Sequence, residues 1–510
     1  MLNWVTVRHS FVPGAPLTVS YRQPGVLLTD HRFTVPLDHD DPSGETIELY
    51  AREVVASDKA GRELPWLLYL QGGPGFGANR FIGKPAWLGR ALEDYRVLLL
   101  DQRGTGHSTP ANRQTLPLRG GPAEQADYLT RFRADSIVRD CEAIRPRVTG
   151  GAPWTVLGQS FGGFCTVAYL SMAPEGLDTA LVTGGLPSLY AHADDVYRAA
   201  YPRIERKVAA HYACYPQDVE RARRIADHLL TREVVLPNGY RLTVEAFQSL
   251  GLMLGSGEGS HRLHHLLEHA FVPAPGGPEL SDAFQEQVQG LLSFAGHPLY
   301  ALVHEAIYAQ DARPTAWSAE RVRAEFPRFD AAKTLAGDEP LLFTGETIHP
   351  WMFDCDPALR PLRETADLLA ARTDWTPLYD PARLAVNEVP VAAAVYHDDM
   401  YVHTPPLPGD RARRAPAAHL GHRRVRARRR PGGRAPRPGP AARPGPRRGV
   451  MSGPPPCRCG GLVFRHDRAD DQSTPAHARR LAASPGRGRP PGRPRVRLRG
   501  GDRLLDRRRP

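Results

Sequence analysis

Apolar and polar positions alternate along two neighbouring stretches near the start of the chain. The first covers residues 32–37 and the second covers residues 46–55, with Asp-Pro-Ser-Gly at 41–44 between them. A period of two residues places alternate side chains on one face of a strand, and this composition between the stretches favours a turn. The pattern therefore predicts an antiparallel β-hairpin over residues 30–56.

Continuous apolar runs follow the hairpin. They cover residues 66–70, 95–100, 154–156, 179–183 and, much later, 389–396. Runs of this length without alternation are typical of strands that are buried on both faces of a sheet. Helical patterns lie between the runs, as in the segment that begins near residue 165. We therefore predict an α/β fold with a doubly wound, mostly parallel sheet.

A different pattern occupies the residues from about 190 to 385. Strand signals are sparse there, and amphipathic helical spacing recurs at 220–233, 263–271 and 299–310. We interpret this insertion as a helical lid over a functional site. The predicted organisation is a core at 1–190, a lid at 191–385, a return to the core at 386–403 and a tail at 404–510.

The predicted tail differs from the rest of the chain in composition. Arg, Pro, Gly and Ala dominate residues 404–510, and Ile, Lys, Glu, Asn and Trp are absent from them. Such a composition buries too little apolar surface to offset chain entropy, which predicts disorder. Residues 403–510 hold 29 of the 66 basic residues but 6 of the 55 acidic ones. The net charge of +11 therefore comes from the tail, and the body of the protein is acidic.

Composition also bears on partners and location. A basic tail can bind nucleic acid or membrane surfaces, but this one lacks interleaved aromatic residues and periodicity, so we expect neither partner. No apolar run is long enough to span a bilayer, and residues 1–8 do not have the pattern of a secretion signal. The six cysteines are scattered, which favours free thiols in a cytoplasmic protein. Cys457 and Cys459 are too close together and too isolated to form a zinc site.

The clearest chemical motif lies between the strand at 154–156 and the helix that follows it. Residues 157–164 read Leu-Gly-Gln-Ser-Phe-Gly-Gly-Phe, and Gly-x-Ser-x-Gly between a strand and a helix is the nucleophile elbow of α/β-hydrolases. Gly158 and Gly162 leave room for a tight turn that lifts the hydroxyl of Ser160 above the sheet. The N–H of Phe161 then points to the place where an oxyanion forms.

A second oxyanion donor is expected in the loop after residues 66–70, which reads Gln-Gly-Gly-Pro-Gly at 71–75. Gly72 and Gly73 allow the backbone to approach a substrate closely and to present its N–H groups. The next predicted strand also ends in a glycine-containing loop, Asp-Gln-Arg-Gly-Thr-Gly at 101–106. Two consecutive strands that end in this way favour a functional site at their carboxyl ends.

Three motifs together resemble the proline iminopeptidase (prolyl aminopeptidase) family, a serine-peptidase branch of the α/β-hydrolases. They are residues 71–75, 101–106 and Gly-Gln-Ser-Phe-Gly-Gly at 158–163. The resemblance extends over about residues 30–402. Gln71 stands where the family usually has histidine, a difference that leaves the backbone donors untouched. The resemblance implies release of N-terminal proline from peptides through an acyl-enzyme on Ser160, without a metal or an organic cofactor.

The resemblance also implies roles for carboxylates. The family's acid follows a late strand, where Asp399 matches it and would orient a histidine; Asp398 is the alternative. Family members recognise the α-ammonium group of the substrate with carboxylates of the lid. Glu305 and Glu346 are the candidates here, because a buried carboxylate is a strong partner for an ammonium group.

The family's catalytic histidine is expected a few tens of residues after Asp399. The histidines downstream lie in or beside the tail, and none follows a credible strand: His403, His419, His422, His466 and His477. One permitted coding of residues 419–429, advanced by one base, translates as Thr-Trp-Val-Thr-Asp-Glu-Tyr-Glu-His-Asp-Gly, which is similar to the family's histidine segment. We therefore interpret the tail as frameshifted and expect the chain to be an impaired hydrolase.

Other functions remain open on the sequence. The elbow specifies acyl chemistry but not the leaving group, so an esterase or a broader aminopeptidase is an alternative. A catalytically dead binding protein with a hydrolase fold is another. Epoxide hydrolases and dehalogenases are disfavoured, because they carry Asp at the elbow. The sequence leaves the oligomeric state and the preferred peptide length undetermined.

Overall fold

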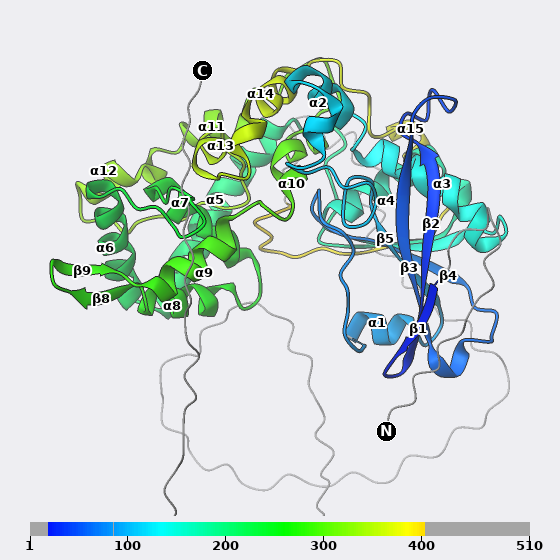
Figure 1. Ribbon diagram of the computed structural model, residues 1–510, viewed down its shortest axis with the longest axis horizontal. Helices are drawn as coiled ribbons and strands as arrows, with labels where there is room; N and C mark the ends of the chain where they lie inside the picture. Colours follow the sequence, from blue (N-terminus) through cyan, green and yellow to red (C-terminus); the bar gives the residue numbers. More distant parts are fainter. Residues whose placement is uncertain (1–18, 85, 403–510) are drawn as a thin grey trace, which may run out of the picture. The chain divides into compact units, whose positions relative to one another are not determined.

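The computed structural model describes residues 19–84 and 86–402 (Figure 1). These residues contain an eight-stranded sheet in the order β1-β2-β3-β5-β4-β6-β7-β10. The predicted hairpin is confirmed as β2 (Val26–Pro36) and β3 (Thr46–Ala56), which pair antiparallel. A strand that the sequence analysis did not anticipate, β1 (Val19–Gln23), pairs with β2. The predictions for the tail at 404–510 and its histidines lie outside the described residues.

The apolar runs form the parallel part of the sheet. The strands are β4 (Trp66–Leu70), β5 (Arg96–Asp101), β6 (Trp154–Gln159), β7 (Leu177–Thr183) and β10 (Val391–Ala394). Pairing is parallel from β5 through β4, β6 and β7 to β10, whereas β3 joins β5 antiparallel. Leu68, Leu98 and Val156 are fully buried on these central strands. The predicted α/β fold with a mostly parallel sheet is thus confirmed.

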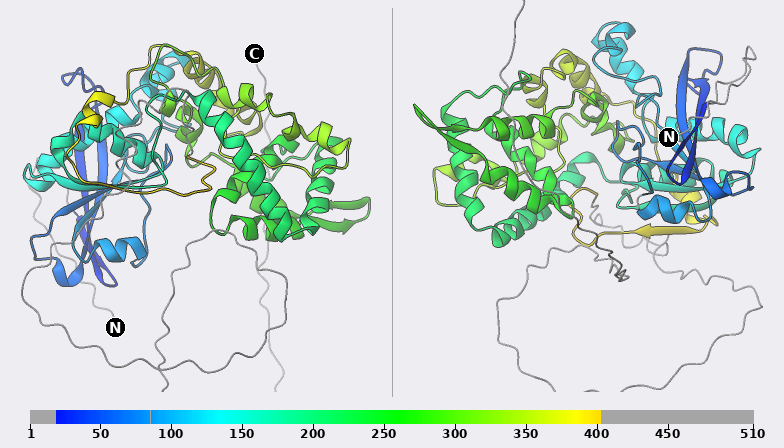
Figure 2. Two further views of the ribbon diagram at one scale, coloured as in Figure 1. Left: turned by 180° about the vertical axis from the view of Figure 1, so that it is seen from behind. Right: turned by 60° about the horizontal axis from the view of Figure 1, so that its bottom comes forward.

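Helices cover the sheet on both faces, as the views in Figures 1 and 2 show. Those of the first half of the chain are α1 (Ala86–Ala91), α2 (Pro122–Leu129), α3 (Ala134–Thr149) and α4 (Phe161–Met172). Every residue of α4 except Met172 is buried. A helix that is apolar on all sides must lie inside the protein, and α4 accordingly packs between the sheet and α3.

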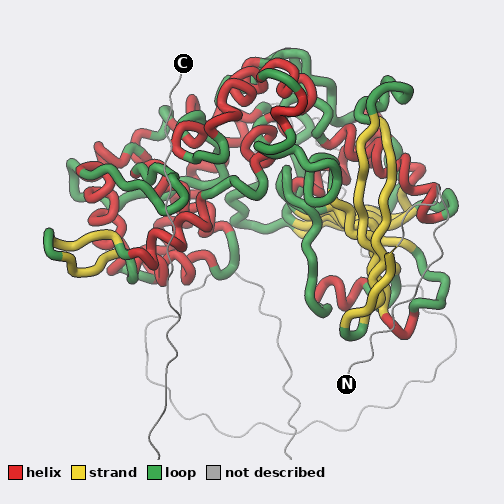
Figure 3. Tube along the Cα trace, in the orientation of Figure 1, coloured by secondary structure: helices red, strands yellow, loops and turns green. Residues whose placement is uncertain are grey.

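The segment after β7 is mainly helical, as the red tubes of Figure 3 show. Its first helices are α5 (Ala193–Cys214), α6 (Gln217–Thr231), α7 (Val244–Gln248), α8 (Gly259–Glu268) and α9 (Asp282–Leu292). A small hairpin, β8 (Phe271–Ala274) with β9 (Gly277–Leu280), interrupts them. The helix predicted over 263–271 therefore ends earlier, at Glu268, because Phe271 pairs with Leu280 in the hairpin.

The remaining helices have nine residues or fewer. They are α10 (Pro298–Val303), α11 (Ser318–Arg323), α12 (Ala331–Leu335), α13 (Met352–Cys355), α14 (Arg363–Ala371) and α15 (Pro381–Ala385). Short 3-10 helices lie at Ser57–Lys59, Leu116–Arg119, Pro174–Gly176, Ser249–Gly255, Ala306–Tyr308, Pro327–Phe329 and Arg360–Leu362. The single helix predicted over 299–310 was wrong: α10 ends at Val303 and η5 (Ala306–Tyr308) follows it.

Two apolar clusters divide the helical segment. The side chains of α5 to α9 pack mostly with one another around Tyr201, Phe247 and Phe284. In contrast, α10, η5 and much of residues 348–379 share the apolar cluster of the sheet. Arg133 of the core is fully buried and donates to the carbonyl of Thr376 at 2.7 Å. This hydrogen bond joins the later part of the helical segment to the core. No helix among the described residues has both the length and the apolar character needed to cross a membrane.

Candidate active site

Ser160 lies at the sharp turn between β6 and α4. Its backbone has φ 50° and ψ −120°, a conformation that costs a residue with a side chain about 1–3 kcal/mol. The flanking glycines make the turn possible. A Cβ on Gly158 would lie 2.2 Å from the carbonyl oxygen of Gly162, and a Cβ on Gly162 would lie 2.0 Å from that of Leu70. The strand, turn and helix predicted for a nucleophile elbow are therefore present.

Neighbouring strands hold the turn in place. The N–H of Ser160 donates to the carbonyl of Thr183 at the end of β7, at 2.9 Å. A Cβ on Gly185 would lie 2.1 Å from the carbonyl oxygen of Ser160, so the chain after β7 also passes directly against the turn. The surrounding sheet supplies the contacts that maintain a strained backbone at this position.

The loop after β4 reaches the serine. A Cβ on Gly72 would lie 3.1 Å from the Cβ of Ser160, so the main chain at Gly72 borders the nucleophile directly. Gly73 has φ 143°, which favours glycine. Phe161 is the first residue of α4, where backbone N–H groups are not used within the helix and the helix dipole favours negative charge. The main chain at Gly72 and the first turn of α4 therefore both border Ser160, and the oxyanion role of Gly72, Gly73 and Phe161 stays a prediction.

The motif at 101–106 holds the loop after β4 in position through hydrogen bonds. The carboxylate of Asp101 is fully buried, accepts the N–H groups of Ala78 and His107 at 2.9 Å each, and pairs with Arg80 at 2.5 Å. These contacts join the loop after β4 to the loop after β5. Gln102 adds a bond from its Nε2 to the carbonyl of Gln71 at 3.0 Å. The motif therefore acts on the site through the position of the loops.

Asp399 follows β10 in a partly buried position, whereas Asp398 is exposed. One oxygen of Asp399 accepts the N–H groups of Tyr401 at 2.8 Å and Val402 at 3.1 Å. A Cβ on Gly184 would lie 3.6 Å from its other oxygen, which places the carboxylate at the carboxyl end of β7. Asp399 is thus oriented by backbone donors close to the turn that carries Ser160.

Glu346 lies in the loop before α13 and is close enough to Asp399 for the two charges to interact. Its Oε1 accepts a hydrogen bond of 2.6 Å from the hydroxyl of Tyr300 on α10. Burial raises the pKa of Glu346 to about 7, a rise that the Tyr300 hydrogen bond opposes and the nearby Asp399 carboxylate reinforces. Few groups in the described structure compensate the negative charge of Glu346, so this carboxylate is suited to bind a cationic group of a ligand.

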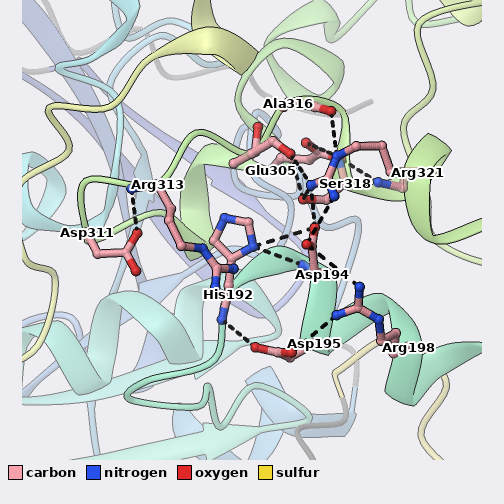
Figure 4. A network of polar contacts seen from close by, with 12 residues as sticks. His192, Asp194, Asp195, Arg198, Glu305, Asp311, Arg313, Ala316, Ser318 and Arg321 are labelled. Atoms are coloured by element: carbon pink, nitrogen blue, oxygen red, sulfur yellow. Dashed lines mark hydrogen bonds and ion pairs between the residues drawn. The ribbon is translucent and has the colours of Figure 1, made fainter.

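Glu305 lies between α10 and η5, is 7% exposed, and is engaged within the protein. Its two oxygens accept the N–H groups of Ser318 at 3.0 Å and Ala319 at 2.9 Å, at the start of α11. Figure 4 shows the carboxylate directed at this turn, beside Arg321, whose guanidinium pairs with Asp194 of α5 at 2.6 Å. Burial raises the pKa of Glu305 to about 6, and the two backbone donors oppose that rise.

The comparisons with known proteins address the family directly. The model of the α/β hydrolase fold matches residues 65–293. A proline iminopeptidase of Aeromonas sobria is 51% identical over 379 residues, covering 74% of this chain and 87% of the relative. The chain belongs to the proline iminopeptidase family. Another proline iminopeptidase, from Aspergillus aculeatus, is 39% identical over 401 residues, covering 75% of this chain and 86% of that protein.

Within residues 19–84 and 86–402, no histidine forms a hydrogen bond with Ser160 or Asp399. His304 is buried between the rings of Tyr300 and Tyr308, and its Nδ1 has no hydrogen-bond partner among the described residues. Burial lowers its pKa to about 4. The histidines of the predicted tail lie outside the described residues.

Sequence reasoning missed the tyrosines around Glu346. The rings of Tyr300 and Tyr308 contact Phe76 of the loop after β4 and Phe164 of α4, respectively, and both hydroxyls interact electrostatically with Glu346. Tyr197 and Tyr401 are also within electrostatic range of Glu346. The available signal was the spacing of Tyr300, His304 and Tyr308 by four residues. This spacing places the three side chains on one face of a helix but does not by itself indicate a binding site.

Proposed function

We propose that this chain is a serine aminopeptidase that releases N-terminal proline from peptides. The observation that carries the proposal is the backbone of Ser160 at φ 50°, with the main chain of Gly72 against its side chain. This arrangement exposes a nucleophile beside backbone donors, as acyl transfer requires. The names of the two relatives, both proline iminopeptidases, support proline as the residue released.

In the proposed mechanism, the Oγ of Ser160 attacks the carbonyl carbon of the N-terminal residue and gives its proton to a histidine. The N–H groups of Phe161 and of Gly72 or Gly73 stabilise the oxyanion. The histidine returns the proton to the departing amine, which leaves the acyl-enzyme, and water then hydrolyses the ester by the same route. Asp399 would hold the histidine in the required tautomer, and its two backbone donors preserve its orientation.

Recognition of the substrate's free amine is assigned to the lid, for which we retain residues 191–385. Glu346 is the stronger candidate, because a protein donor is found for one of its oxygens, Oε1, whereas both oxygens of Glu305 are bonded. We propose that Glu346 binds the α-ammonium group. Glu305 would contribute indirectly, by fixing the start of α11.

We further propose that the 510-residue chain is impaired, because residues 404–510 are frameshifted and the family's histidine segment is lost. The absence of a histidine bonded to Ser160 or Asp399 among the described residues supports this proposal. We also propose action on peptides in the cytoplasm, without a nucleic-acid partner. Among the described residues, Cys141, Cys165 and Cys355 are free, in keeping with a reducing compartment.

The decisive experiment compares the 510-residue chain with a version whose reading frame is restored near codons 400–430, as guided by the DNA sequence. Proline p-nitroanilide and p-nitrophenyl acetate are the substrates, and Ser160→Ala in the restored enzyme is the control. We expect the restored enzyme to cleave the prolyl substrate and the original chain to be slower by about 10⁴–10⁶-fold. Equal turnover by both chains would refute the impairment. Turnover of the acetate alone would refute the aminopeptidase assignment.

A further inference from the structure

Helix α8 gathers metal-binding side chains on its last turn, away from the residues assigned to the reaction. His264, His265 and Glu268 each place one ligand atom within 4.8 Å of the other two. The Nε2 of His264 lies 3.5 Å from one oxygen of Glu268, and the Nδ1 of His265 lies 3.2 Å from the other. Two imidazoles and a carboxylate are a donor set that zinc-type cations accept.

A buried carboxylate orients the first of these ligands. The Nδ1 of His264 lies 2.9 Å from an oxygen of Asp218, whose side chain is fully buried. Asp218 also accepts a hydrogen bond of 2.9 Å from Arg221. Because a carboxylate accepts hydrogen bonds, the ring proton of His264 belongs on Nδ1 and leaves a lone pair on Nε2. Metal-binding histidines commonly donate their second ring nitrogen to a carboxylate in this manner.

The resulting arrangement calls for a cation. The lone pair of His264 Nε2 faces a carboxylate oxygen of Glu268 at 3.5 Å, and two acceptors in that position repel each other. A metal ion between them would bind both. The His264 ring cannot easily turn away, because it stacks on Tyr215 with 3.9 Å between ring centroids.

We propose that His264, His265 and Glu268 form a binding site for a divalent cation of the zinc type. His265 and Glu268 are exposed, so the ion reaches the site from solvent, and water completes its coordination. The site lies on the solvent-facing side of α8, within the helical segment of α5 to α9, and Asp218 connects it to α6. Binding therefore stabilises this helical segment rather than taking part in peptide cleavage.

The test is isothermal titration calorimetry, in which Zn²⁺ is titrated into the full chain after a chelator has removed any bound metal. The site variants are His265→Gln and Glu268→Gln. The controls are His397→Gln, an exposed histidine outside this helix, and Glu258→Gln, an exposed glutamate beside it. We expect each site variant to bind Zn²⁺ at this site at least tenfold more weakly and each control to bind as the unmodified chain does. Because each variant differs from the unmodified chain at a single residue, Zn²⁺ binding at the unchanged histidines and cysteines contributes to all five isotherms alike. Equal binding isotherms for all five would overturn the proposal.

A spectroscopic readout tests the part played by Asp218. Co²⁺ bound by two imidazoles and a carboxylate gives visible absorption bands that the site variants should lose. Asp218→Asn retains an acceptor for His264 but removes the charge, and it should weaken Co²⁺ binding by about 10–100-fold. If this buried substitution prevents folding, the exposed His265 and Glu268 variants decide the question. Identical Co²⁺ spectra for those variants and the unmodified chain would also overturn the proposal.

Discussion

The hydroxyl of Tyr300 donates a 2.6 Å hydrogen bond to the carboxylate of Glu346. The same tyrosine lies against the loop after β4, where a Cβ on Gly75 would come within 2.5 Å of the N of Tyr300. One residue of α10 therefore contacts both the proposed ammonium ligand and the loop that carries the proposed oxyanion donors. In the proposed mechanism, α10 would therefore link substrate recognition to carbonyl activation.

The first prediction concerns Glu346→Gln in the frame-restored enzyme. The amide keeps an acceptor for Tyr300 but loses the charge that faces the substrate's ammonium. We expect kcat/KM for proline p-nitroanilide to fall about 10- to 150-fold, which corresponds to a loss of roughly 1.5–3 kcal/mol in transition-state stabilisation. Hydrolysis of p-nitrophenyl acetate should change little, because that ester has no amine. Equal losses on both substrates would remove Glu346 from ammonium binding.

Glu305→Gln should act on stability. The carboxylate of Glu305 accepts two backbone N–H groups at the start of α11, and an amide replaces one acceptor with a donor that faces an N–H. We expect the free energy of unfolding in urea to fall by about 1–3 kcal/mol. The control is Glu325→Gln, an exposed partner of Arg198, for which a change below about 1 kcal/mol is expected. A selective loss of activity on the prolyl substrate, with unchanged stability, would instead make Glu305 an ammonium ligand.

The raised pKa of Glu346 predicts a pH dependence. The group is neutral below a pKa of about 7 and is a carboxylate above it, so ammonium binding should strengthen as the pH rises through 7. We expect KM for proline p-nitroanilide to fall between pH 6 and pH 8, an effect absent from Glu346→Gln. The unfolded-state pKa is lower, so ionisation of Glu346 should reduce stability as the pH rises from about 4.5 to 7. Thermal unfolding of the enzyme with Glu346 and of the Glu346→Gln variant between pH 4.5 and pH 7 measures this loss of stability.

Tyr300→Phe tests the hydrogen bond itself. The donor from Tyr300 lowers the pKa of Glu346, so its removal should raise that pKa and move the KM profile towards higher pH. The phenyl ring keeps the packing against Phe76, so the protein should remain folded. A shift of the profile to lower pH, or none, would show that Tyr300 does not tune this carboxylate.

The turn at Ser160 provides a prediction that does not depend on substrate. Both Ser160→Ala and Ser160→Gly remove the nucleophile, but glycine tolerates φ 50° whereas alanine retains the strain. We expect the glycine variant to unfold at the higher urea concentration, with about 1 kcal/mol more stability than the alanine variant. Greater stability of the alanine variant would mean that the surrounding contacts do not strain this residue.

The sequence by itself determined the hairpin, the central strands and the nucleophile elbow. These features follow from local rules: a period of two for β2 and β3, continuous apolar runs for β4 to β7, and glycines on both sides of Ser160. Motif order was also sufficient to suggest the family, which the relatives confirm. Each of these signals is contained within a few consecutive residues, so no knowledge of distant contacts was needed.

Tertiary structure decided which of the two candidate carboxylates is engaged within the protein and where the helices after β7 end. The sequence offers Glu305 and Glu346 as equal candidates, but one meets two backbone N–H groups of α11 and the other a single tyrosine hydroxyl. The helix predicted over 299–310 breaks where Glu305 turns towards Ser318 and Ala319, and the helix over 263–271 ends where Phe271 joins a hairpin. Those outcomes depend on residues far apart in sequence, because burial and hydrogen-bond partners are properties of the folded chain.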